Sequence, residues 1–511
     1  ILAWSGAMTA APVAPGVALA LVSHTNAGKT TLARTLLGRD VGEVRDLPHV
    51  TDLAEAHTLL ALPDGTTLQL WDTPGFGNSA KLMQRLRLVD NPIGWLLREV
   101  WDRWRDRPFW CSQQAVRAAR DAADVVLYLA NAAEDPRDAG YLAPEMQVLR
   151  WIGKPVIVLL NQVGPPRAPQ LEQEDLERWQ RHLEPYGVVA EVLALDAFAR
   201  CWVHEGVLLE AVGRVLPAER REAFARLAAE WTAQSLAKFD AAMTLLAAHL
   251  AGAALDHEPV PEVSVSTLQR LLQSVGVGRE RAEAARDAAM AALAARLDAR
   301  LVEVTDRLIR LHGLDGAATR TVLERMREHF ATPGRVGEGR AAIWGSVVTG
   351  ALTGLKADIA AGGLTLGAGL LVGGLLGGLA GAGVARGLNR ISGADEPVVW
   401  WSDEFLEGLV RSAVLRYLAV AHFGRGRGKW VEGEAPPYWK AEVATVVERQ
   451  RPRLQGAWAA ARAAMAGPAP ERIEQTPLAH ELQDVLGQAS AEVLERLYPR
   501  RLPAGLAARR E

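Results

Sequence analysis

Short apolar runs alternate with longer segments of helical periodicity through the first part of the chain. Continuous apolar runs of this length are typical of strands buried on both faces of a sheet, and their alternation with helices favours parallel βαβ units. A turn composition, Pro63-Asp64-Gly65, joins the second run to the third. The pattern predicts an α/β domain with a mostly parallel sheet over residues 8–215. The five runs lie at 17–22, 58–62, 68–71, 125–129 and 155–160.

The strand pattern stops after about residue 215. Large apolar residues then recur at helical spacing from Arg220 to Leu250, and again from Leu293 to Leu311. Prolines at 259 and 261 should end the first helix. The second set forms a heptad-like seam, which fits a bundle core or a dimerising coiled coil; its short length favours the bundle. We therefore expect helical domains at 216–340 and 391–511.

A glycine-rich hydrophobic segment separates these two helical domains at 341–390. The stretch from Ile359 to Ala385 contains no charged residue, and a membrane-spanning helix needs about 20 apolar residues. Glycines recur at every fourth position from Gly369 to Gly381, which places a stripe of small residues on one helix face and permits close packing. The segment is predicted to form a helical hairpin, either inserted in a membrane, which we favour, or buried in protein. Indole side chains, which favour membrane interfaces, flank it at Trp344, Trp400 and Trp401.

Composition narrows the class of partner. The 511 residues carry a net charge of −3, and no segment forms a strongly basic domain, so nucleic acid is not expected as the main partner. Cys111 and Cys201 are the only cysteines, which excludes a disulfide framework and favours a reducing cytoplasm. Residues 1–7 precede Met8 and are interpreted as a cloning remnant.

Residues 23–30, Ser-His-Thr-Asn-Ala-Gly-Lys-Thr, lie between the first apolar run and a helical segment. They fit the phosphate-binding pattern G-x-x-x-x-G-K-[ST], except that Ser23 replaces the first glycine. Gly28 lets backbone N–H groups approach phosphate oxygens, Lys29 reaches the β- and γ-phosphates, and Thr30 offers its hydroxyl to Mg²⁺. The predicted nucleotide-binding residues of this loop are Asn26, Ala27, Gly28, Lys29, Thr30 and Thr31.

Further polar positions follow the later runs in a consistent order. Asp72 directly follows the third run and is placed to support Mg²⁺, and the N–H of Gly75 can sense a γ-phosphate. Thr51, in the polar stretch before the hairpin, is a candidate switch threonine and Mg²⁺ ligand. Asn161 directly follows the last run and is a candidate nucleotide-binding residue.

This ordered set, over residues 17–200, resembles the GTPases of the translation-factor-related class, especially the Era- and TrmE-like branch that modifies tRNA and assembles ribosomes. The segment 196–202 and the later glycine-rich stretch resemble a bacterial family, domain of unknown function 3482. The resemblance implies a P-loop GTPase head that turns over GTP slowly to GDP, with Mg²⁺ as cofactor. It places Lys29, Thr51 and Gly75 in the catalytic roles, and Thr30, Thr51 and Asp72 around the metal.

Two positions depart from the pattern of that class. The guanine-reading motif N-K-x-D is replaced by Asn161-Gln162-Val163-Gly164, so the aspartate that accepts hydrogen bonds from guanine is missing and ATP stays open as a substrate. Phe76 follows Gly75 where many GTPases have a water-orienting glutamine. Some related GTPases instead hold K⁺ with a loop asparagine, and Asn26 occupies that position, which makes K⁺ a candidate cofactor.

A tryptophan-rich insertion occupies residues of about 80–120. Its amphipathic character fits a segment packed on the head or a surface that docks a partner. Its tryptophans are Trp95, Trp101, Trp104 and Trp110.

The predicted function is a slow GTPase switch whose nucleotide state controls a helical, membrane-associated region. The expected partners are GTP, membrane lipid, an unidentified protein and a second copy of the chain bound through the helical region. The expected location is the cytoplasm, at the periphery of the inner membrane or anchored there by the hairpin. The alternatives are a nucleotide-gated scaffold with little turnover that never enters a membrane, and an ATP-using membrane-remodelling protein.

Overall fold

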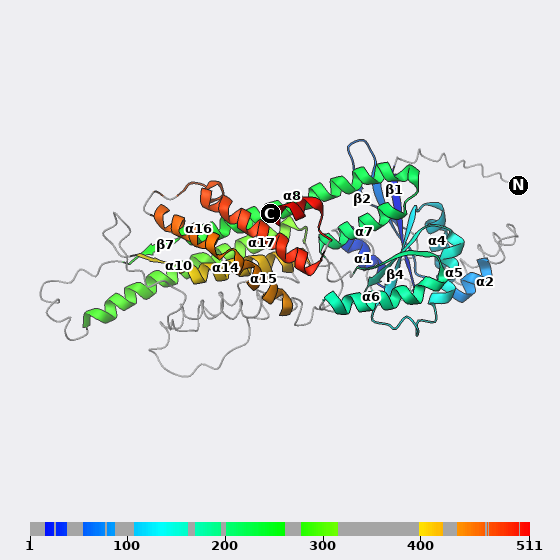
Figure 1. The fold of residues 1–511 in the computed structure, drawn as a ribbon, viewed down its shortest axis with the longest axis horizontal. Coiled ribbons are helices and arrows are strands. Elements are labelled where there is room, and N and C mark those ends of the chain that lie inside the picture. The colour runs from blue at the N-terminus through cyan, green and yellow to red at the C-terminus, as the bar shows by residue number, and fades with distance from the viewer. Residues whose placement is uncertain are drawn as a thin grey trace. The chain divides into compact units, whose positions relative to one another are not determined.

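The computed structural model divides into two compact units (Figure 1). The α/β unit comprises residues 1–235 and 422–430, and the helical unit comprises residues 236–421 and 431–511. The packing therefore changes within the helix α8 (Ala218–Leu255), whereas the sequence placed a boundary at residue 215. The structure describes residues 16–24, 27–37, 55–76, 79–86, 107–161, 169–195, 201–260, 277–314, 398–422, 437–465, 468, 470–499 and 501–510.

The α/β unit is built on a six-stranded sheet with the strand order β2-β3-β1-β4-β5-β6. Every neighbouring pair is parallel except the edge hairpin of β2 and β3. The turn of that hairpin contains Asp64 and Gly65, where Gly65 has a φ of 86° and Asp64 Oδ1 accepts the Thr66 N–H at 3.0 Å. The predicted mostly parallel sheet is therefore confirmed. The strands are β1 (Gly16–Ser23), β2 (Glu55–Ala61), β3 (Thr67–Asp72), β4 (Val125–Asn131), β5 (Val156–Asn161) and β6 (Val189–Ala194).

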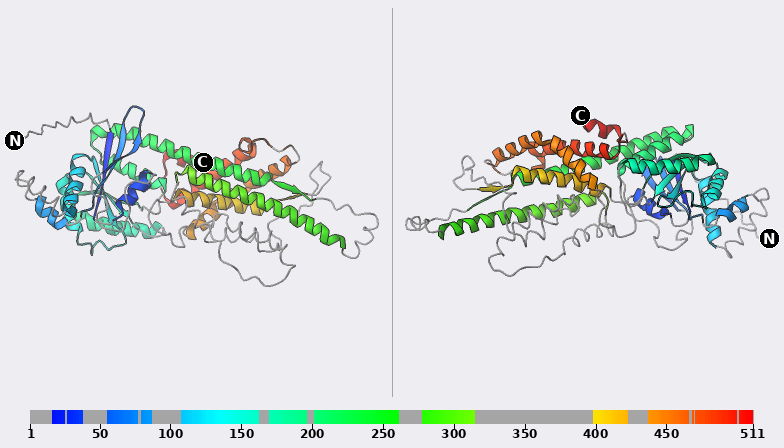
Figure 2. Two further views of the ribbon diagram at one scale, coloured as in Figure 1. Left: turned by 180° about the vertical axis from the view of Figure 1, so that it is seen from behind. Right: turned by 60° about the horizontal axis from the view of Figure 1, so that its bottom comes forward.

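Helices cover both faces of this sheet (Figures 1 and 2). Alternate residues of β1 supply the two hydrophobic layers: Leu19 and Leu21 face one layer, and Ala20 and Val22 the other. Burial on both faces explains why the strands are continuous apolar runs. The first layer contains residues of α1 (Lys29–Leu37), α7 (Trp202–Val215) and the beginning of α8. The second layer contains residues of α2 (Ser79–Leu86), α4 (Arg107–Asp121), α5 (Leu142–Ile152) and α6 (Pro169–Leu183). A 3₁₀ turn, Glu184–Tyr186, follows α6.

Part of the tryptophan-rich insertion is described by the structure. Phe109 of α4 is buried in the second layer, and the Lys81 ammonium lies 4.3 Å from the centroid of its ring. These contacts fit the interpretation of a segment packed on the head. Trp95, Trp101 and Trp104 lie outside the described residues.

The helical unit packs its long helices around an apolar core. The predicted seam lies on α10 (Val277–Leu311), and four of its leucines, at 293, 297, 301 and 308, are buried within the unit itself. This burial supports the bundle-core interpretation of the seam. The other elements are α14 (Asp403–Ala421), α15 (Pro437–Arg449), α16 (Arg451–Ala464), α17 (Pro477–Leu497), α18 (Ala504–Ala507) and the 3₁₀ turns Ile473–Gln475 and Ala508–Arg510.

Two findings differ from the sequence-based expectation for this unit. A short antiparallel pair, β7 (His257–Pro259) with β8 (Val398–Trp400), interrupts the otherwise helical structure. The prolines at 259 and 261 disfavour helix at the residues before them, which leaves the chain extended there. Trp400 and Trp401 are buried, and Trp401 stacks on Phe405 at 4.2 Å, so these two indoles belong to the protein core rather than to a membrane interface.

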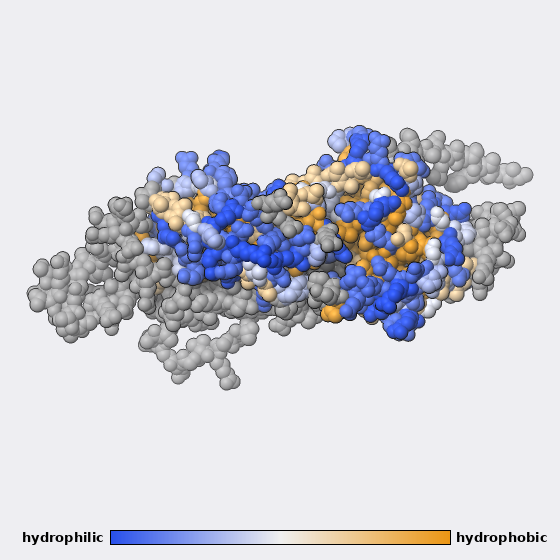
Figure 3. Space-filling view, viewed as in Figure 1, coloured by the Kyte–Doolittle hydropathy of each residue, from blue (hydrophilic) through white to orange (hydrophobic). Residues whose placement is uncertain are grey.

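The predicted glycine-rich hairpin at 341–390 lies outside the described residues, as does Trp344. In the part of the chain that the structure describes, no helix is long and apolar enough to cross a membrane. In the view of Figure 3 the described surface of the helical unit is mainly hydrophilic, while hydrophobic residues gather on part of the α/β unit. The membrane interpretation therefore rests on the sequence of 341–390.

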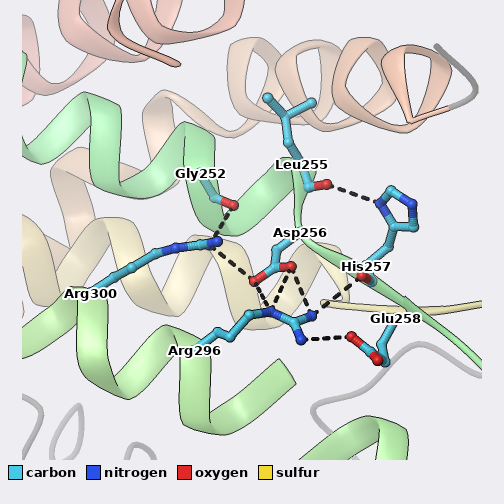
Figure 4. Close-up of polar contacts among 7 residues, drawn as sticks. All are labelled: Gly252, Leu255, Asp256, His257, Glu258, Arg296 and Arg300. Atoms are coloured by element: carbon cyan, nitrogen blue, oxygen red, sulfur yellow. Dashed lines mark hydrogen bonds and ion pairs between the residues drawn. The ribbon is translucent and has the colours of Figure 1, made fainter. Parts of the chain in front are cut away.

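An ion-pair cluster fixes the end of α8 against α10 (Figure 4). Arg296 Nε and Nη2 donate to the Asp256 carboxylate, and the third guanidinium nitrogen, Nη1, donates to Glu258 at 2.6 Å. Arg300 Nη1 donates to the Gly252 carbonyl at 2.9 Å and to Asp256 Oδ2 at 3.0 Å. Positive charge at the last carbonyls of a helix complements its dipole. The cluster thus stabilises the point where α8 ends and β7 begins.

Replacing Asp256 with asparagine should destabilise the helical unit by about 2 kcal/mol. The Asp256 side chain is 9% exposed and balances two guanidinium groups, and removal of one partner leaves positive charge uncompensated. The arginines are about one-third exposed, which keeps the cost below that of a fully buried pair. Urea unfolding of the full chain measures the change. Glu303→Gln is the control, because its exposed pair with Arg307 at 3.8 Å is worth less than about 0.5 kcal/mol; equal costs would contradict the prediction.

His249 gives the helical unit a second testable property, a loss of stability in acid. Neither ring nitrogen has a hydrogen-bond partner among the described residues, and burial, with Arg416 and Arg300 nearby, lowers its pKa to about 3. The folded-state pKa lies below the ordinary 6.5, so the unfolded chain gains the proton first as the pH falls. Stability present above pH 6.5 is therefore lost toward pH 3, at about 1.4 kcal/mol per pH unit.

We expect His249→Leu to remove this dependence. Between pH 7 and pH 5 the wild-type chain should lose about 2 kcal/mol more unfolding free energy than the variant, since about 1.5 pH units of the window are crossed. Urea unfolding at both pH values measures the difference. His480→Leu, at an exposed position on α17, is the control. If His249→Leu lost as much unfolding free energy between pH 7 and pH 5 as the wild-type chain, His249 would not be the source of the pH dependence.

Candidate functional site

The predicted phosphate-binding loop connects β1 to α1. Gly28 has a φ of 89°, which only glycine adopts without strain. Its carbonyl accepts the first helical hydrogen bond, from Leu32 N at 2.9 Å, and α1 begins at Lys29. The backbone of the loop is therefore turned at the glycine and leads directly into a helix N-terminus, where N–H groups bind anions.

Lys29 is folded into this loop. Its side chain is buried, and Nζ donates to Ser23 Oγ at 2.8 Å. Burial lowers the pKa of Lys29, while the carboxylates of Asp72 and Glu145 raise it. Ser23, which replaces the first glycine of the pattern, thus supplies an acceptor for the lysine, a role that the sequence motif did not reveal.

Thr30 and Asp72 meet as the sequence predicted for a metal pair. Thr30 Oγ1 donates to Asp72 Oδ2 at 2.7 Å. Asp72 is 3% exposed, and its other oxygen, Oδ1, is buried without a hydrogen-bond partner among the described residues. Burial raises the pKa of Asp72, which Thr30 and Lys29 counteract. A buried carboxylate oxygen without a donor is costly, and oxygen ligands suit Mg²⁺, so the residues present fit that ion.

Asn161 reaches the loop from the end of β5. Its side chain is fully buried, and Nδ2 donates to the Ala27 carbonyl at 2.8 Å. The structure therefore brings this residue to the predicted loop, where its amide holds the loop backbone. Its contact with a nucleotide base stays a prediction.

The segment after β3 is held against the loop by several hydrogen bonds. Phe76 N donates to the Ser23 carbonyl at 2.9 Å, and Thr73 Oγ1 donates to the Leu21 carbonyl. The Gly75 carbonyl accepts from Ser112 Oγ at 3.2 Å. Gly75 is thereby held beside the phosphate-binding loop. The Phe76 ring is fully buried, so this position supplies no polar group to the site.

Sequence reasoning missed Glu145, a buried carboxylate of α5. Oε1 accepts from His24 Nδ1 at 2.7 Å and from Ser79 Oγ at 2.6 Å, and Oε2 accepts from the Tyr128 hydroxyl at 2.6 Å. A signal was present: Glu145 lies among the apolar residues that form the buried face of α5. A charged residue in such a stripe requires partners, and the sequence did not indicate which ones.

Several predicted residues lie outside the described part of the chain. They are Asn26 and Thr51, predicted to contact cations, and Gln162 and Gly164 of the base-reading motif. Their assigned roles stay predictions. The residues that the structure does bring together are Ala27, Gly28, Lys29, Thr30, Thr31, Asp72, Gly75 and Asn161.

Comparison with known proteins gives two family matches. Residues 18–162 match the 50S ribosome-binding GTPase family, and residues 189–484 match domain of unknown function 3482. GTPase Der of Mycobacterium ulcerans and GTPase Der of Mycobacterium marinum are each 29% identical over 181 residues. That alignment covers 35% of this chain and 32% of each relative, so the chain matches about a third of their length.

Similar solved structures include two of Era. An Era variant from Aquifex aeolicus bound to GDP.AlF4- is 21% identical, covering 40% of this chain and 57% of that one with a TM-score of 0.29. Era in complex with MgGDPNP and part of 16S ribosomal RNA is 20% identical, covering 40% and 58% with a TM-score of 0.29.

The family match over residues 18–162 confirms the predicted GTPase domain, since it spans the loop, Thr30, Asp72 and the end of β5. The second family match spans more than half of the chain, including α8, α10, α14 and α16. The chain belongs to the family of domain of unknown function 3482, which here follows a P-loop GTPase domain of the translation-factor-related class.

Proposed function

We propose that this chain binds GTP and hydrolyses it slowly to GDP and phosphate, and that the bound nucleotide acts as a switch. The observation that carries the proposal is the gathering of Lys29, Thr30 and Asp72, all held in place by hydrogen bonds beside the glycine turn of the loop. These residue types, in this order and burial, suit a triphosphate with a divalent cation.

Each residue of the site has a distinct task in the proposed reaction. The N-terminus of α1 and the backbone at Gly28 bind phosphate oxygens, and the Lys29 ammonium compensates their charge. Thr30 and Asp72 would hold Mg²⁺, which supplies positive charge beside the β- and γ-phosphates when bound. A water molecule attacks the γ-phosphorus, the bond from that phosphorus to the β–γ bridging oxygen breaks, and GDP and phosphate leave. Thr51 and the Gly75 N–H are proposed to contact the γ-phosphate side of the site.

We further propose that K⁺ assists the reaction. The Phe76 ring is fully buried, so the position that often carries a water-orienting glutamine supplies no polar group here. Asn26 is the proposed K⁺ contact, and the cation would compensate the charge that develops during phosphoryl transfer.

The nucleotide state is proposed to control the helical region. The uncharged stretch in 341–390 is the reason to propose a membrane surface as one target. A cytoplasmic protein that meets the inner membrane through this segment, with a second copy or an unidentified protein as further partner, fits the proposal. Nucleic acid is not proposed as the main partner because the net charge is −3, although one of the similar Era structures is a complex with 16S ribosomal RNA nucleotides.

The decisive experiment measures phosphate release by the full chain given GTP or ATP, each in KCl and in NaCl. Turnover selective for GTP and faster in KCl would support the proposal and the role of Asn26. Equal use of ATP would favour the ATP-using alternative, which the missing aspartate at Gly164 keeps open. Binding without turnover would favour the nucleotide-gated scaffold, and co-sedimentation with vesicles that is the same in GTP and GDP would count against nucleotide-controlled membrane contact.

A further inference from the structure

Glu145 lies in the α/β unit between the phosphate-binding loop and the helix that follows Gly75. Its side chain is fully buried, and its three hydrogen-bond donors come from three different elements. His24 directly follows β1, Ser79 is the first residue of α2, and Tyr128 belongs to the central strand β4. One carboxylate therefore joins three parts of the unit that are distant in sequence.

Glu145 is a buried acidic side chain whose carboxyl oxygens are surrounded by hydrogen-bonding groups. The Ser79 and Tyr128 hydroxyls donate to its two oxygens, and His24 Nδ1 lies 2.7 Å from Oε1. The burial of Glu145 is offset by these three contacts and by its position in the first turn of α5, where the helix dipole favours negative charge.

Two of the three contacts of Glu145, those with His24 and Ser79, adjoin the nucleotide site. His24 is next to Ser23, whose hydroxyl accepts a hydrogen bond from the Lys29 ammonium. The His24 ring also stacks on the Tyr141 ring, with 4.1 Å between the ring centroids. On the other side, Ser79 begins the helix just beyond Phe76, whose N–H donates to the Ser23 carbonyl. Tyr128 is fully buried within the sheet, and its hydrogen bond attaches the carboxylate to the sheet.

We infer that Glu145 is a positioning residue of the nucleotide site, which holds the phosphate-binding loop and the start of α2 at the spacing that GTP requires. The inference rests on the proposed GTPase function. GTP meets both segments through its γ-phosphate, whereas GDP meets the loop alone. Loss of the carboxylate should therefore weaken the binding of GTP more than the binding of GDP.

The test compares the affinities of a non-hydrolysable GTP analogue and GDP for the full-length chain. Glu145→Gln keeps the shape of the side chain and removes its charge, and we expect the ratio of GTP-analogue to GDP affinity to fall about tenfold. Ser79→Ala removes one of the two contacts with the site and should lower the same ratio by a smaller factor. Glu134→Gln is the matched control, because Glu134 is exposed and accepts a hydrogen bond from the Tyr141 hydroxyl. This substitution should leave the ratio unchanged.

A double substitution separates positioning from general destabilisation. If Glu145 and Ser79 act through one contact, Ser79→Ala should change the ratio less in the Glu145→Gln background than in the wild-type chain. An equal loss for both nucleotides, or a lower unfolding temperature with an unchanged ratio, would overturn the inference and leave the GTPase proposal standing. If Glu145→Gln does not fold, Ser79→Ala alone decides, and an unchanged ratio in it refutes the inference. A wild-type chain that binds neither nucleotide would refute the proposed function, and the inference with it.

Discussion

Lys29→Ala should abolish turnover, lowering the rate of phosphate release from GTP by at least about 100-fold. The Lys29 ammonium is the charge that the loop itself brings to the phosphates, and it is already held in position through Ser23. Alanine at this position removes the charge and leaves the backbone turn at Gly28 intact. The affinity for GTP should fall with the rate, because the lysine contacts phosphates in both the bound substrate and the transition state. Phosphate release and the binding of a fluorescent GTP analogue measure the two effects.

Lys154→Ala is the matched control for this substitution. Lys154 lies just before β5, and β4 and β5 run parallel to β1, so it is at the opposite edge of the sheet from the loop that follows β1. We expect its rate and affinity to match those of the wild type. If Lys29→Ala released phosphate as fast as the control, the loop would not be the site of turnover and the GTPase proposal would be wrong.

The α/β unit was predictable because its signals are local in sequence. Continuous apolar runs report burial on both faces of a sheet, and the order of the loop residues, Asp72 and Asn161 reports where the strands end. Parallel strands bring those ends to one edge, so the contacts of Thr30 with Asp72 and of Asn161 with Ala27 follow from the topology.

Other features depend on partners that the sequence does not specify. Glu145 is one glutamate on an apolar helix face, and only the fold shows that His24, Ser79 and Tyr128 converge on it. The pairing of β7 with β8 joins segments that are far apart in the chain. Indole rings favour both membrane interfaces and protein cores, so composition alone does not distinguish these two environments for Trp401. Long-range packing, rather than propensity, decides each of these cases.

Restoring an aspartate to the base-reading motif should produce the second large effect, on nucleotide choice. The motif ends in Gly164, which lies outside the described residues and has no side chain to accept hydrogen bonds. In Gly164→Asp the carboxylate would accept from guanine N1 and N2, while adenine would leave it unpaired, and unpaired polar groups dominate such discrimination. We expect the preference for GTP over ATP to rise by about 100-fold, measured by competition of each nucleotide against fluorescent GDP.

Gly164→Asn is the control for the shape of the new side chain. Its amide oxygen can accept one hydrogen bond from guanine, but the amide lacks the charge and the second acceptor that the aspartate provides. A rise in GTP preference that is confined to the aspartate variant would show that this loop meets the base edge and that the wild-type chain lacks the usual discrimination there. Equal behaviour of both variants would show that the base is read elsewhere. The Asn161 amide would then act through the Ala27 carbonyl alone, as a support for the phosphate-binding loop.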